Sequence, residues 1–133
     1  MFSGVSTLEG MHQVIAICVG ACTGALSRWQ LGIWLNSSGA LPWGTLAANA
    51  IGGYLIGVCM AYFQTHPHLD PVWRLAVVTG FLGALTTFSS FSAEVIDLMQ
   101  QGRWGMAAAW IASHLIASLL LTVAGIATVQ SLR

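Results

Sequence analysis

Four long apolar stretches, separated by short polar breaks, set the pattern of this sequence. The stretches cover residues 14–35, 43–63, 72–98 and 104–129. Each reaches or exceeds the roughly 20 residues that a helix needs to cross a bilayer. The breaks are rich in residues that are typical of turns. Because backbone polar groups in lipid must be satisfied within a segment, the pattern predicts one all-α transmembrane domain of four helices over residues 1–133.

Composition supports a lipid environment for most of the chain. Of its 133 residues, 56% are hydrophobic and only 6% are charged, whereas soluble domains are about 25% charged. Lysine is absent, the formal net charge is zero and no basic run occurs. These features argue against nucleic acid as a partner and against a polybasic lipid-binding patch, and they leave membrane lipid as the expected surroundings. Tryptophans near the predicted segment ends fit an interfacial aromatic belt: Trp29, Trp34, Trp43, Trp73 and Trp104.

The first thirteen residues and the cysteines carry weaker signals. Residues 1–13 contain no Lys or Arg, so we expect an interfacial lead-in and no signal peptide. Cys18, Cys22 and Cys59 all fall in apolar runs. We expect them to act as small packing residues, because a metal site needs more ligands at closer spacing.

The arginines are balanced between the two sides of the membrane. Four spans place Arg74 and Arg133 on the side of the termini, and Arg28 and Arg103 on the other side. The positive-inside rule then gives no preferred orientation. The balance predicts a chain that inserts both ways, so that two opposite copies pair about an axis in the membrane plane. The alternative is that Arg28 lies too deep to count, or that a weak bias exists.

The first helix contains closely spaced glycines and one charged residue. Gly20, Gly24 and Arg28 share one helix face, where the glycines predict a close helix contact. Arg28 either draws anions into a vestibule or anchors the helix end by snorkelling.

The second helix carries Asn49, which either donates to an anion or joins helices by hydrogen bonds. Gly53 and Gly57 predict another close contact.

The third helix is unusual near its middle. Residues 80–92 hold two glycines and five hydroxyl residues, which weaken a helix interior. They predict a break whose freed carbonyls could hold a cation. Phe88 and Phe91 share a face, which Glu94 and Asp97 continue, and the positive ring edges suit a small anion. The alternative is ordinary packing with hydroxyl hydrogen bonds.

The fourth helix has a polar stripe. His114, Ser118 and Thr122 follow one another at four-residue spacing, beside Ser113. A lone intramembrane histidine is often a packing residue, but a stripe of three favours a pore or a partner.

Three segments together resemble a known family. Residues 20–29, 44–53 and 80–92 are similar to the signature segments of the CrcB/Fluc fluoride channels. The resemblance implies an antiparallel homodimer with two pores in the bacterial inner membrane. It also implies export of fluoride that entered the cell as neutral HF, down its electrochemical gradient.

The resemblance also implies roles for single residues. The ring edges of Phe88 and Phe91 would meet fluoride, and Asn49 would be the pore amide. Carbonyls of Gly83 and Thr86, from both subunits, would hold a structural Na⁺ ion, and Arg28 would line the vestibule. The candidates for a polar track are Thr87, Ser90 and Ser118, whereas His114 stands where a hydroxyl residue is expected.

Two other functions fit parts of the pattern. A small dual-topology, proton-coupled multidrug exporter would need a carboxylate in the membrane. The first helix has none, and Glu94 and Asp97 lie toward the end of the third. A structural membrane subunit would explain the glycines but not residues 80–92. An enzyme is not expected, because no nucleophile–base pair or metal-ligand cluster is evident.

Overall fold

The computed structural model describes residues 7–37, 39 and 41–133, and every regular element in that part of the chain is a helix. The elements are α1 (Thr7–Leu35), α2 (Trp43–Thr65), α3 (Pro71–Arg74), η1 (Leu75–Leu82), α4 (Gly83–Leu85), α5 (Phe88–Gln100) and α6 (Trp104–Ser131). The elements from α3 to α5 together form one span, Pro71–Gln100. Four helices are therefore long and apolar enough to cross a membrane, which confirms the predicted all-helical class.

The first helix begins earlier than hydrophobicity alone predicts. It starts at Thr7, so the polar residues before Val14 continue the helix, and Glu9 lies in its first turn. An acidic residue there is favourable because the helix N-terminus carries partial positive charge. Main-chain hydrogen bonds extend a helix beyond its apolar core, which hydropathy cannot detect. Residues 1–6 of the expected lead-in lie outside the described residues.

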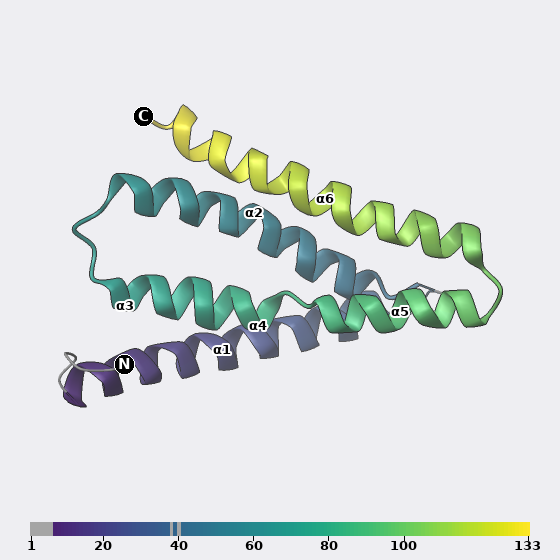
Figure 1. Ribbon diagram of the computed structural model, residues 1–133, viewed down its shortest axis with the longest axis horizontal. Helices are drawn as coiled ribbons and strands as arrows, with labels where there is room; N and C mark the ends of the chain where they lie inside the picture. The colour runs from purple at the N-terminus through teal and green to yellow at the C-terminus, as the bar shows by residue number, and fades with distance from the viewer. Residues whose placement is uncertain (1–6, 38, 40) are drawn as a thin grey trace.

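The spans pack in two pairs. α2 runs along α6, and α1 packs against η1 and α4. Figure 1 shows α2 between α6 and the third span, with the start of α1 and the end of α6 at one end of the molecule. An even number of spans predicts that placement.

Glycines allow both pairs to approach closely, as predicted from their spacing. A Cβ on Gly53 would lie 2.8 Å from the Ser118 carbonyl oxygen of α6, and a Cβ on Gly57 would overlap the next turn of that helix. Cβ atoms on Gly20 and Gly24 would likewise overlap main-chain atoms of the third span. Small residues bring helix backbones together in the same way in other membrane proteins.

The third span changes conformation along its length. Asp70 caps its start by accepting a hydrogen bond from the Val72 amide at 2.9 Å, and Pro71 is the first helical residue. Residues Leu75–Leu82 are π-helical. After α4, Thr86 and Thr87 are extended, with ψ of 156° and 122°, and α5 then begins. The span therefore consists of two helical halves joined by two extended residues.

The outer surface is apolar, as expected for a chain in lipid. The five tryptophans near the helix ends are all exposed, whereas the sixth, Trp110, is buried. Cys18 and Cys22 lie on the exposed face of α1, and Cys59 packs beside the cluster of Ala48, Leu82 and Leu85.

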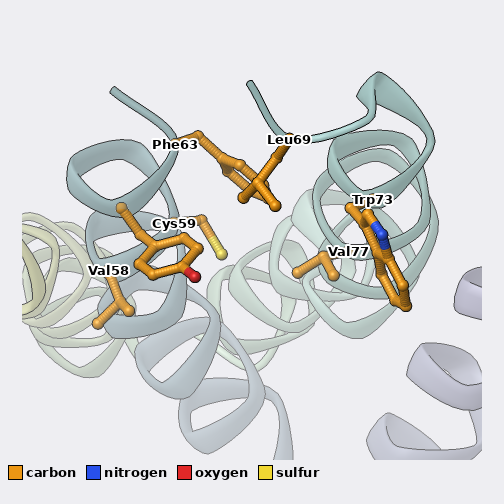
Figure 2. A pocket seen from close by; sticks show the side chains of 7 residues that line it. Val58, Cys59, Phe63, Leu69, Trp73 and Val77 are labelled. Atoms are coloured by element: carbon orange, nitrogen blue, oxygen red, sulfur yellow. The ribbon is translucent and has the colours of Figure 1, made fainter. Parts of the chain in front are cut away.

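An apolar hollow of about 330 Å³ lies between the end of α2 and the start of the third span. Figure 2 shows Cys59 and Phe63 on one side of this hollow and Trp73 and Val77 on the other. The hollow is distinct from the polar region in the middle of the fold, because none of its lining residues belongs to that region.

Candidate functional site

The two extended residues Thr86 and Thr87 form an interruption of the third span. An open groove of about 860 Å³ runs along this interruption. Its walls come from α2, the third span and α6. Most of the residues singled out in the sequence line it: Asn49, Gly83, Thr86, Thr87, Phe88, Phe91, His114, Ser118 and Thr122. The fold thus gathers polar residues that lie far apart in the chain into one place within the membrane.

Asn49 holds the interruption in place. Its Oδ1 accepts a hydrogen bond from the Thr87 amide at 2.8 Å, and its Nδ2 donates to the Thr87 carbonyl at 3.0 Å. Nδ2 also lies 3.2 Å from Nδ1 of His114. One side chain on α2 therefore fixes both polar groups of an extended residue and reaches α6. The hydrogen-bonding alternative for Asn49 is observed in this chain, and the amide has no hydrogen left over.

The interruption frees main-chain carbonyls, among them those of Gly83 and Thr86. In a continuous helix the Thr87 amide would return to Gly83, but here it donates to Asn49. The Ser90 amide would return to Thr86, but it donates to Oγ1 of Thr87 at 3.2 Å. Carbonyl oxygens are ligands that hard cations accept. The donor chemistry of Gly83 and Thr86 therefore fits the Na⁺ ion that the family resemblance implies.

Hydroxyl groups start the second half of the span. Thr87 is the N-cap of α5, and its side chain is buried. Its hydroxyl lies 3.2 Å from Oγ of Ser90 and 3.3 Å from Oγ of Ser89. This N-cap satisfies an amide at the helix start, whereas neither serine is among the residues that line the groove.

The two phenylalanines differ in their surroundings. Their ring centroids are 5.5 Å apart with an interplanar angle of 55°. Phe88 is 78% exposed in this chain, whereas Phe91 is half-buried and its centroid lies 4.6 Å from that of His114. Both rings line the groove, Phe91 beside His114 and Phe88 at its exposed edge.

The polar stripe of α6 has unequal members. His114 is only 5% exposed and its Nε2 has no hydrogen-bond partner in the described part of the chain. Thr122 donates to the Gly53 carbonyl at 2.9 Å and so joins α6 to α2. Ser118 is half-buried, and no hydrogen bond of its hydroxyl is found among residues 7–37, 39 and 41–133. Thr122 therefore acts in packing, while His114 and Ser118 keep free donors.

Arg28 lies apart from this groove. It is half-buried on α1, and it is not among the residues that line the groove. Within the described residues no hydrogen bond or ion pair of its guanidinium is found. The fold therefore leaves both alternatives for Arg28 open.

A second polar cluster was not anticipated. Glu94 accepts hydrogen bonds from the Thr45 hydroxyl and from Nε1 of Trp110, the latter at 3.0 Å. Asp97 is exposed and accepts from Gln101 at 2.7 Å. The signal for Trp110 is its position four residues before His114, which extends the stripe of α6 by one turn.

Comparison with known proteins yields a consistent set of relatives. Residues 15–126 match the family model described as "CrcB-like protein, Camphor Resistance (CrcB)". A protein of Albidiferax ferrireducens is 63% identical over 118 residues, which cover 89% of this chain and 91% of the relative. A protein of Variovorax paradoxus is 59% identical over 90% of this chain and 95% of the relative. One of Pseudomonas aeruginosa is 54% identical over 85% and 90%. All three relatives are named "Fluoride-specific ion channel FluC".

Proposed function

The chain belongs to the CrcB family, and on that premise we propose that it is a fluoride-selective channel that exports cytoplasmic fluoride down its electrochemical gradient. It is a multi-pass protein of the bacterial inner membrane, with four helices suited to crossing the bilayer. The relatives cover nearly its whole length, so the proposal concerns the entire chain and not an attached domain.

One observation carries the proposal within the fold. The interrupted third span and its neighbours line one groove with phenylalanine rings and with hydroxyl, amide and imidazole groups. Fluoride leaves water only at a cost of tens of kcal/mol by Born reasoning. Several weak donors in series can replace that hydration without holding the ion too tightly to conduct. The residues proposed to meet the ion are Phe88, Phe91, Ser90 and Ser118. They lie near Thr87, whose main-chain groups are hydrogen-bonded to Asn49.

We propose that the working unit is an antiparallel homodimer with two pores. The arginines are balanced between the two sides of the membrane, which permits both orientations. The groove is open in a single chain, and Phe88, which lines it, is largely exposed. A second, inverted copy would close the groove and give the Phe88 ring a place within a pore.

A Na⁺ ion at the dimer centre fits the same interruption. The carbonyls of Gly83 and Thr86 are the proposed ligands, because the amides that would normally use them are engaged elsewhere. When bound, the cation supplies positive charge that favours a nearby anion and joins the two subunits. Arg28 is the proposed vestibule residue, because it is the charged residue of α1 nearest the end opposite the termini.

The decisive experiment measures anion efflux from liposomes that contain the purified protein. We expect rapid fluoride efflux and no chloride efflux above that of protein-free liposomes. Equal rates for the two anions, or no efflux of either, would contradict the proposed selectivity.

Substitution of the rings tests the site. Phe88→Ile and Phe91→Ile should each reduce fluoride efflux strongly while the protein still assembles. Phe63→Ile is a matched control, because Phe63 lines the separate apolar hollow (Figure 2) and should leave efflux unchanged. Unchanged efflux in both Phe88 and Phe91 variants would mean that these rings only pack.

A further inference from the structure

We propose that His114 binds the permeating fluoride ion through its Nε2–H, as a neutral imidazole that Asn49 holds in one tautomer. The inference rests on the proposed function and deepens it. It concerns a residue where a hydroxyl side chain was expected, and it follows from the hydrogen bonds around the interruption.

The tautomer of His114 follows from the Asn49 amide. Main-chain groups of Thr87 fix which end of Asn49 is oxygen, because Oδ1 must face the Thr87 N–H and Nδ2 must face the Thr87 carbonyl. The second hydrogen of Nδ2 then points to Nδ1 of His114, at 3.2 Å. An amide nitrogen donates and does not accept. Nδ1 must therefore accept, and the proton of the neutral ring resides on Nε2.

This Nε2–H is a buried donor without a partner. His114 is 5% exposed, and Nε2 has no hydrogen-bond partner in the described part of the chain. Leaving a buried donor unsatisfied costs about 1–3 kcal/mol. Native proteins rarely keep such a group without a reason, such as a ligand that completes it.

The surroundings of the ring suit an anion. Ser118 lies one turn further along α6, lines the same groove and has a hydroxyl that is free among the described residues. The Phe91 ring lies beside the imidazole, with centroids 4.6 Å apart. The Thr87 carbonyl nearby is bound by Asn49, and Glu94 is bound by Thr45 and Trp110. The groove wall at this place therefore offers two free donors, the His114 Nε2–H and the Ser118 hydroxyl.

A neutral donor also suits conduction. A cationic side chain within the membrane would hold an anion strongly, whereas a channel needs sites from which the ion can leave. The hydrogen bond from Asn49 favours the neutral ring, because protonation of Nδ1 would place two donors against each other. His114 thus supplies one strong N–H without a formal charge.

Two substitutions separate the two nitrogens of His114. Asparagine places its amide near the former Nδ1 and can accept from Asn49, but it has nothing at the former Nε2. Glutamine reaches the former Nε2 with a donor and abandons Nδ1. We expect His114→Asn to reduce fluoride efflux from liposomes at least tenfold and His114→Gln to retain at least a third of it.

The outcomes are distinct. Wild-type efflux in His114→Asn, or an equal loss in both variants, would overturn the inference, because His114 would then act through packing or through Asn49 alone. The wild-type protein serves as the internal reference. If it passes fluoride no faster than chloride, the proposed function itself fails, whatever the variants do.

A spectroscopic measurement tests binding without transport. In protein labelled with ¹⁵N-histidine, the His114 signals should be those of a neutral ring with its proton on Nε2. Addition of sodium fluoride should shift the Nε2 resonance, and addition of the same concentration of sodium chloride should not. A His114 Nε2 resonance that does not shift on addition of fluoride would overturn the inference. A spectrum that shows the proton on Nδ1 would overturn it as well.

Discussion

Replacement of Asn49 by alanine should destabilise the fold and also straighten the third span. Alanine is the best helix former and adds no bulk, so the change removes only the polar contacts of Asn49. Those contacts are two hydrogen bonds to the Thr87 peptide and one to His114. Their loss also leaves the amide of Thr87, a residue that is 7% exposed, without its partner.

The size of the effect follows from these contacts. Hydrogen bonds between transmembrane helices average about 0.6 kcal/mol each, and a buried unpaired amide costs about 1–3 kcal/mol. We therefore expect the free energy of unfolding to fall by about 2–4 kcal/mol. Part of the loss can be recovered if the Thr87 amide returns to the Gly83 carbonyl, which would extend the helix through the interruption.

Unfolding in mixed micelles with increasing dodecyl sulfate, followed by circular dichroism, measures this change. Ser113→Ala is the matched control, because the Ser113 hydroxyl bonds only to the Ala109 carbonyl of its own helix, at 2.8 Å. The control should stay within about 0.5 kcal/mol of wild type. An Asn49→Ala variant as stable as this control would show that Asn49 does not hold the interruption.

Further changes test other parts of the fold. Gly57→Ala should lower stability by about 2 kcal/mol or more in the same assay, because its Cβ would overlap the Thr122 carbonyl. Gly105→Ala, with nothing within 4 Å of its Cβ, should not lower it. Gly102 has a φ of 73°, so Gly102→Ala should cost about 1 kcal/mol in that assay. Arg28→Gln should lower fluoride efflux severalfold at low ionic strength and less at high, since salt screens attraction of an anion to a vestibule.

The sequence predicts the spans well because the signal is local. Each apolar run is long enough to cross a bilayer, and the segment around Thr86 and Thr87 stands out by its own glycines and hydroxyls. The exact residues of the interruption are not local information. They depend on Asn49, 38 positions earlier in the chain, whose amide replaces the helical hydrogen bond of Thr87.

Spacing along the sequence predicts which residues share a helix face, but not the contacts that they make. The four-residue spacing places His114 and Ser118 on one face of α6, which the groove confirms. Spacing does not reveal that both hydrogens of the Asn49 amide are already used, or that the His114 Nε2–H has no partner. Both facts depend on distances between helices. Glu94 was grouped with the phenylalanines by its spacing, but its partners Thr45 and Trp110 come from the two neighbouring spans.

The two-part construction of the third span has a consequence for biogenesis. Its second half, α5, carries Glu94 and Asp97 toward the end of the span, and an acidic residue within an apolar span opposes the insertion of a lone helix. The Glu94 carboxylate is accommodated by Thr45 of α2 and by Trp110 of α6, and α6 is synthesised last. The Glu94 carboxylate therefore gains its Trp110 partner only once α6 has entered the bilayer beside α5.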